Sequence, residues 1–151
     1  MDKTRICFVC SGCTDRSPMA VWIANAKIKE NKLPFVVFAR GLFVGRGDRV
    51  CEKSVSAVEH LGIPANVRVV PTEMNKDEIG SFDYVLCMTN EQKAIIKSKF
   101  NYDAKTISEF ADFIDIEDPF GGPQEMYDKV AKDLDYAIEQ IFERIYKEKL
   151  L

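Results

Sequence analysis

Apolar and polar residues alternate along the chain between short strand-like runs and longer helix-like stretches. Apolar runs rich in β-branched and aromatic residues predict four strands, over residues 6–9, 35–39, 83–88 and 105–108. Apolar positions at helical spacing predict five helices, over residues 19–32, 51–61, 75–79, 90–100 and 126–150. Strands that alternate with helices form βαβ units, so we predict an α/β fold built on a four-stranded parallel sheet.

Three segments between these elements are expected to lack regular secondary structure. They are a glycine- and arginine-rich loop, a short extended stretch and an acidic loop, over residues 40–49, 67–71 and 109–117. Arg40, Arg46 and Arg49 of the first loop either meet an acidic protein substrate or form an ordinary solvated surface. Thr72 is expected to cap the helix at 75–79.

Composition and charge place the chain among ordinary globular proteins. Hydrophobic residues make up 46% and charged residues 30% of its 151 positions, which suits one domain over residues 1–151. A net charge of −3 gives no reason to expect a nucleic acid partner, and no apolar run approaches the ~18 residues of a membrane span. Five cysteines and the absence of a signal peptide favour the reducing cytoplasm, where we expect a monomer.

The segment from Cys10 to Pro18 joins the first predicted strand to the first long helix. The apolar run ends at Cys10, small and polar residues follow, and Ser17 before Pro18 predicts a helix start. The carboxyl end of a strand facing a helix N-terminus is where open α/β sheets bind ligands. Backbone N–H groups and the helix dipole at that place favour an anion.

Cys10 and Arg16 bracket this loop, with five residues between them. A thiolate in a loop rich in N–H groups is a nucleophile, and a guanidinium binds two phosphate oxygens at once and keeps its charge. Ser17 can hydrogen-bond to the thiolate. A bare C-x5-R pattern would more simply be a buried cysteine and a surface arginine, but the strand before it, Gly12 within it and the helix start after it favour a catalytic pair.

The loop resembles that of the low-molecular-weight protein tyrosine phosphatase family, V-C-x-G-N-x-C-R-S-P. Six residues match the pattern: Val9, Cys10, Gly12, Arg16, Ser17 and Pro18. Cys13 stands where the family has an asparagine that braces the loop, and Asp15 stands where it has a second cysteine. The resemblance implies a three-layer fold of the phosphotyrosine protein phosphatase I type, with helices on both faces of a twisted sheet. It also implies a phosphorylated protein as substrate and neither metal nor cofactor.

A second motif, Asp118-Pro119-Phe120-Gly121-Gly122, precedes the last predicted helix. Pro119 keeps Asp118 out of the helical conformation, although a lone Asp-Pro would be an ordinary turn. The family carries its general acid in a D-P-aromatic loop at this place, which implies that Asp118 is the acid and that Phe120 forms a wall of the substrate slot. The resemblance further implies that Cys10 attacks phosphorus while Arg16 and the loop bind the phosphoryl oxygens, with Ser11, Gly12, Cys13, Thr14 and Asp15 as binding residues.

Thr14 points to the phosphorylated group. Tyrosine-directed members of the family usually carry an aliphatic residue there, whereas the bacterial branch that acts on protein phosphoarginine carries Thr and also reads D-P-F-G-G. The carboxylate of Asp118 suits a guanidine, to which it can form two hydrogen bonds. We therefore favour phosphoarginine over phosphotyrosine. Asp15 either adds a negative potential that favours such a leaving group or points away and caps the helix.

Three other functions remain open from the sequence. Because Cys13 and Asp15 depart from the family pattern, the loop could bind phosphoproteins without turning them over. Arsenate reductases share this fold and a thiolate loop, but they use a downstream pair of cysteines, whereas Cys51 and Cys87 lie far apart in sequence. The C-x2-C-x2-C run ending at Cys13 is also typical of iron–sulfur ligation, but it lacks a fourth ligand.

Overall fold

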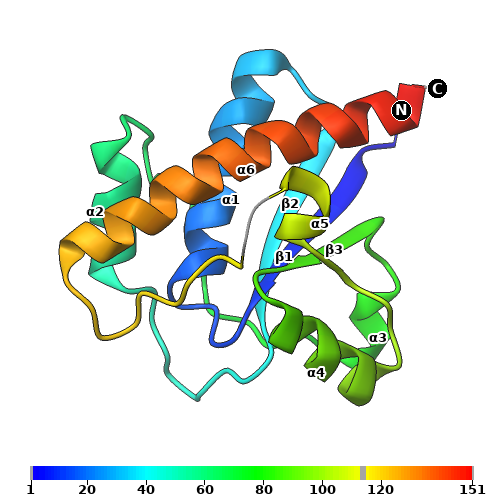
Figure 1. Ribbon diagram of the computed structural model, residues 1–151, viewed down its shortest axis with the longest axis horizontal. Helices are drawn as coiled ribbons and strands as arrows, with labels where there is room; N and C mark the ends of the chain where they lie inside the picture. The colour runs from blue at the N-terminus through cyan, green and yellow to red at the C-terminus, as the bar shows by residue number, and fades with distance from the viewer. Residues whose placement is uncertain (1, 113–114, 151) are drawn as a thin grey trace.

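A parallel sheet of four strands forms the middle of the molecule, in the order β2-β1-β3-β4 (Figure 1). The computed structural model describes residues 2–112 and 115–150. The strands are β1 (Thr4–Cys10), β2 (Phe35–Gly41), β3 (Tyr84–Cys87) and β4 (Lys105–Thr106). Strand β1 is central because its apolar run is buried on both sides, as parallel strands require. The register pairs Cys10 at the carboxyl end of β1 with Gly41 at the end of β2.

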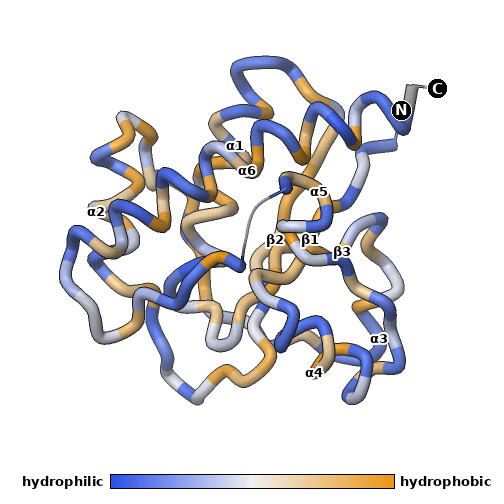
Figure 2. Tube along the Cα trace, viewed as in Figure 1, coloured by the Kyte–Doolittle hydropathy of each residue, from blue (hydrophilic) through white to orange (hydrophobic). Residues whose placement is uncertain are grey.

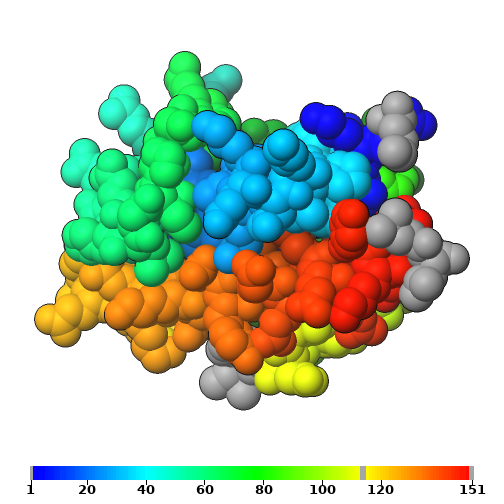
Figure 3. Space-filling model, turned by 90° about the horizontal axis from the view of Figure 1, so that it is seen from above, coloured from blue at the N-terminus to red at the C-terminus, as the bar shows by residue number. Residues whose placement is uncertain are grey.

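Helices cover both faces of the sheet and complete three layers. One face carries α1 (Arg16–Asn31), α2 (Glu52–His60), α5 (Ile107–Ala111) and α6 (Gln124–Leu150), and the other carries α3 (Lys76–Ile79) and α4 (Asn90–Phe100). Helix α6 runs the length of the molecule alongside α1 and α2 (Figure 3). None of the helices that the structure describes combines the length and apolarity needed to cross a membrane.

Two apolar cores flank the sheet because side chains of β1 alternate between its faces. Ile6, Phe8 and Cys10 face α1 and α6, whereas Cys7 and Val9 face the opposite core. In Figure 2 the apolar positions accordingly gather along the strands in the interior. The α/β fold with a four-stranded parallel sheet and helices on both faces is confirmed.

One predicted boundary was wrong where a helix follows β4 directly. The predicted strand extends to residue 108 and is followed by an acidic loop at 109–117. In the structure, α5 begins at Ile107. A reciprocal capping box explains this: the Thr106 hydroxyl accepts from the Glu109 N–H, and the Glu109 carboxylate accepts from the Thr106 N–H. Residues 113–114 of the expected loop lie outside the described residues.

Two helix starts also differ from expectation. Helix α1 begins at Arg16, so Ser17 lies inside the helix and Asp15 occupies the N-cap position. Helix α3 is capped by Asn75, whose side chain accepts from the Glu78 N–H, and not by Thr72. In both places a polar residue near the start was correctly recognised, but the position of the cap was wrong.

Candidate active site

The loop over residues 11–15 connects β1 to α1 and is held from one side by the end of β2. The N–H groups of Leu42 and Phe43 both donate to the Ser11 carbonyl oxygen, at 2.8 Å each. Gly41 approaches so closely that an added Cβ would lie 2.9 Å from the Cys13 nitrogen. The loop backbone is therefore fixed by β2 and turns through Cys13, whose φ is +57°.

Cys10 lies at the bottom of this loop with two donors directed at its sulfur. The Cys13 N–H donates to Cys10 Sγ at 3.3 Å, and the Ser17 hydroxyl lies 3.0 Å from the same sulfur. Cys10 is only 2% exposed, yet it lines the floor of a cleft of about 710 Å³. Ser17 and Cys13 are buried behind the cleft wall, and burial raises the pKa of the Cys13 thiol. An anionic sulfur at this position would be hydrogen-bonded by both neighbours.

Arg16 reaches along the loop toward the segment that precedes α6. Its Nη1 donates to the Ile116 carbonyl oxygen at 2.8 Å, and its Nη2 lies 3.6 Å from Asp118 Oδ2. Ile116 is itself held by an N–H···O bond to Met88 at the end of β3. The guanidinium is therefore fixed from outside its own helix and faces the cleft beside Cys10.

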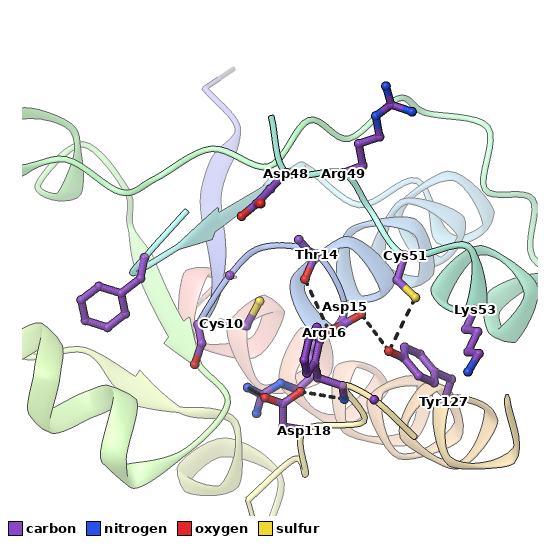
Figure 4. Close-up of a pocket in the computed structure, with 15 residues that line it drawn as sticks. Cys10, Thr14, Asp15, Arg16, Asp48, Arg49, Cys51, Lys53, Asp118 and Tyr127 are labelled. Atoms are coloured by element: carbon purple, nitrogen blue, oxygen red, sulfur yellow. Dashed lines mark hydrogen bonds and ion pairs between the residues drawn. The ribbon is translucent and has the colours of Figure 1, made fainter. Parts of the chain in front are cut away.

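Asp118 stands at the mouth of the cleft, in the turn that the sequence singled out. Its Oδ1 accepts from the Phe120 N–H at 3.1 Å, which holds the turn, while about half of its side chain is exposed. Figure 4 shows Cys10, Arg16 and Asp118 along the same cleft. The exposed rings of Phe43 and Phe120 also line it, so the predicted wall at Phe120 has an unforeseen counterpart in Phe43.

Asp15 is buried in the wall of the cleft and does not cap the helix. Its side chain makes no capping hydrogen bond; Oδ1 instead accepts from the Tyr127 hydroxyl at 3.2 Å and Oδ2 from the Thr14 hydroxyl at 3.4 Å (Figure 4). Burial raises the pKa of the Asp15 carboxyl, and the nearby Asp118 adds to this, while Tyr127, Thr14 and Arg16 oppose it. The alternative in which Asp15 points away and caps α1 is wrong.

Gln92 and Tyr127 were also missed from the sequence. Gln92 is buried on α4, where its Oε1 accepts from the Met88 N–H and its Nε2 donates to the Ser11 hydroxyl at 3.1 Å. Tyr127 lies on α6 and starts the buried stripe that continues at Val130 and Leu134. A tyrosine that opens an otherwise hydrocarbon stripe was the available signal, because a buried hydroxyl needs a partner.

The arginine-rich loop only partly faces the site. Arg40 donates to Glu78 at 2.6 Å and lies over the Phe38 ring, so its role in meeting a substrate is not supported. Arg49 does line the cleft, together with Lys53 of α2. Basic groups therefore reach the rim, although fewer come from this loop than expected.

The other cysteines are distributed over both faces of the sheet. Cys7 packs in the core opposite to Cys10 and Cys13, which rules out a shared cluster of the three. Cys87 is buried in that opposite core, and burial raises the pKa of its thiol to about 12. Cys51 lines the cleft and contacts the Tyr127 hydroxyl. Cys51 and Cys87 thus do not form the downstream pair of an arsenate reductase.

Known proteins resemble the chain over almost its whole length. A protein-arginine-phosphatase from Geobacillus stearothermophilus is 35% identical, with 96% of this chain and 98% of that protein aligned. The low molecular weight protein-tyrosine-phosphatase PtpB from Staphylococcus epidermidis is 29% identical, with 91% and 96% aligned. The solved structure of the YwlE arginine phosphatase from Geobacillus stearothermophilus superposes with a TM-score of 0.84 at 32% identity, over 97% of this chain and 96% of that one.

The family to which these proteins point also matches the chain directly. The model of the family described as low molecular weight phosphotyrosine protein phosphatase aligns with residues 5–150. That range includes both the loop at Cys10 and the turn at Asp118. The chain therefore belongs to the low molecular weight phosphotyrosine protein phosphatase family and is a protein phosphatase.

Proposed function

We propose that this phosphatase hydrolyses phosphoarginine in proteins, through a phosphocysteine intermediate on Cys10. The observation that carries the proposal is that the polar side chains of Thr14, Asp15 and Asp118 line the same cleft as Cys10. A leaving guanidine offers several N–H donors, and these side chains offer oxygen acceptors. The protein-arginine-phosphatase among the relatives supports the same substrate class.

The first chemical step is the transfer of the phosphoryl group to sulfur. The Cys10 thiolate attacks phosphorus in line as the P–N bond to the guanidine breaks. Arg16 and the N–H groups of the loop bind the three phosphoryl oxygens, where the charge of the transition state is spread. Asp118 in its protonated form donates its proton to the departing nitrogen, so that the arginine leaves with its guanidinium intact.

The second step restores the enzyme. Asp118, now ionised, takes a proton from a water molecule whose oxygen attacks phosphorus as the S–P bond breaks. Inorganic phosphate and the Cys10 thiolate are the products. The Ser17 hydroxyl, 3.0 Å from Cys10 Sγ, donates to the leaving thiolate and so lowers the cost of its departure.

Phosphotyrosine is the second candidate substrate. The exposed Phe43 and Phe120 rings at the rim of the cleft can pack against a phenol, and the staphylococcal relative is named a protein-tyrosine-phosphatase.

We further propose that the protein works as a monomer in the cytoplasm, where its cysteines, all free in the structure, stay reduced.

Initial rates on two peptides of the same sequence test this function, one with phosphoarginine and one with phosphotyrosine. We expect a higher kcat/KM for phosphoarginine and a loss of at least about 10³-fold for both substrates in Cys10→Ser, which removes the thiolate nucleophile. Faster release from phosphotyrosine would reverse the order of the two candidates. Binding of both peptides without release by the unaltered protein would identify a binding module instead.

A further inference from the structure

A buried carboxylate, that of Asp15, lines the cleft at whose floor Cys10 lies. Asp15 is 6% exposed and lines the cleft, and its side chain accepts from the neutral hydroxyls of Tyr127 and Thr14. Among the ion pairs of residues 2–112 and 115–150, none involves Asp15. Burying a charge without a counter-charge is costly unless a ligand supplies one, and this carboxylate is open to a ligand only through the cleft.

The same carboxylate determines which way the Thr14 hydroxyl points. Thr14 Oγ1 donates its only proton to Asp15 Oδ2, at 3.4 Å. A hydroxyl whose proton is engaged in this way presents its lone pairs to whatever lies in front of it. The Thr14 oxygen therefore acts as an acceptor toward the cleft, and Asp15 and Thr14 together form an acceptor surface.

The two candidate leaving groups respond to such a surface in opposite ways. A phosphorylated guanidine carries N–H donors, and its departing nitrogen takes the electron pair of the P–N bond together with the proton of Asp118, so that the arginine leaves as a cation. A phosphorylated phenol carries no donor at its ester oxygen and develops negative charge when the P–O bond breaks. A negative charge at Asp15 stabilises the first and destabilises the second, because unit charges at short range interact strongly in a partly buried site.

We propose that Asp15 is a specificity-determining residue, which biases the site toward phosphoarginine through its own charge and through the acceptor orientation of Thr14. The inference rests on the proposed function and adds a residue that stands outside the family pattern. Asp15 complements Asp118: the latter contacts the departing nitrogen and transfers the proton, whereas Asp15 sets the potential of the opposite wall.

The ratio of kcat/KM for the two matched peptides, measured for Asp15→Asn and Asp15→Cys, tests the proposal. Asparagine keeps the shape of the side chain and one oxygen acceptor but removes the charge. Cysteine removes the charge and the oxygen acceptors. We expect the phosphoarginine-to-phosphotyrosine ratio to fall by about tenfold in each variant, the scale of one charge-assisted hydrogen bond. Asp48→Asn is the matched control, because Asp48 is an exposed carboxylate at the rim of the same cleft; its ratio should stay within about twofold.

The outcomes separate this proposal from the function on which it rests. The kcat/KM ratio of the unaltered enzyme for the two peptides decides which substrate is preferred. Only the change of that ratio in the variants tests the role of Asp15. An equal loss on both peptides, or an unchanged ratio, would reduce Asp15 to a structural role and overturn the proposal, as would an equal shift in Asp48→Asn. If turnover is too slow to measure, the dissociation constants of both peptides for Cys10→Ser, with and without Asp15→Asn, measure the part of the preference that is present in the bound ground state; an unchanged ratio of these constants would likewise overturn the proposal.

Discussion

Cys13 holds a backbone conformation that most side chains avoid. Its φ of +57° lies in the left-handed region, which glycine and asparagine adopt more readily and which costs other residues about 1 kcal/mol. The conformation turns the Cys13 N–H onto the sulfur of Cys10, 3.3 Å away. The loop thus turns back onto Cys10 without the asparagine of the family pattern.

The buried carboxylate of Asp15 should make the stability of the enzyme depend on pH. Burial and the nearby Asp118 raise the pKa of this carboxyl above its unfolded value of about 3.9, although Tyr127, Thr14 and Arg16 act in the opposite direction. The ionised form is therefore disfavoured in the folded state. The free energy of unfolding that protonated Asp15 contributes, relative to its ionised form, is fully present below about pH 4 and is lost as pH rises through the folded pKa. Asp15→Asn should therefore be more stable than the unaltered enzyme at pH 7.5.

Urea unfolding of both proteins across pH 4 to 7.5 measures this difference. We expect the stability advantage of Asp15→Asn to shrink as pH falls toward 4, because the Asp15 carboxyl of the folded enzyme takes up its proton. Asp48→Asn controls for the loss of one carboxylate at an exposed position. A constant difference over the whole range would mean that Asp15 does not titrate differently in the folded and unfolded states.

The sequence located the proposed reactive side chains but not the side chains that hold the site in place. Cys10 and Arg16 were found from the C-x5-R loop between a strand and a helix start, and Asp118 from the resemblance of its D-P-aromatic motif to the family; the structure places all three on one cleft. Gln92 and Tyr127 could not be found in this way, because each acts through a contact that only the fold creates, with Ser11 and Asp15 respectively. Their roles depend on burial and distance, which a pattern of residue types does not encode.

At the scale of elements, the loop depends on how closely β2 approaches it. A Cβ at Gly41 would lie 2.9 Å from the Cys13 nitrogen and 3.0 Å from the carbonyl carbon of Gly12, so Gly41→Ala must displace the loop backbone. We expect kcat/KM to fall by about a hundredfold, as for other displacements of about 1 Å, together with a lower Tm.

Gly80→Ala provides the matched control for this substitution. Gly80 has a φ of −75°, and an added Cβ would meet no atom within 4 Å, so activity and Tm should both be retained. Activity and Tm retained in Gly41→Ala as well would show that the loop accommodates the extra methyl group, and the close approach would then have no functional meaning.

Hydrophobic periodicity predicted the order of strands and helices because each long element buries an apolar face. It failed at the junction of β4 and α5. Strand β4 has only two residues and α5 only five, which is too few for a period to emerge. The capping box at Thr106 and Glu109 was the signal that could have located α5.

At the scale of the whole molecule, the last helix is connected to the first loop by one hydrogen bond. The Tyr127 hydroxyl of α6 donates to Asp15 Oδ1 across 112 positions of sequence. We expect Tyr127→Phe to lower the free energy of unfolding by about 2 kcal/mol at pH 7.5, since a hydrogen bond to a buried charge is lost.

A double-mutant cycle isolates that bond from other effects of Tyr127. In an Asp15→Ala background the Tyr127→Phe substitution should cost less than half as much, because the carboxylate that it served is gone. Equal costs in the two backgrounds, measured by urea unfolding, would assign the loss to the other contact of the hydroxyl, that with Cys51 Sγ, and not to the contact with the loop.

The large sequence separation of these contacts affects how the enzyme folds during its synthesis. Arg16 is held by Ile116, 100 positions later, and Asp15 by Tyr127. A chain emerging from the ribosome exposes Cys10 first, gains Ile116 only with the segment before α6, and gains Tyr127 only with α6 itself. Because contacts of such sequence separation form late, the polypeptide cannot assemble its complete phosphate site before synthesis is nearly finished.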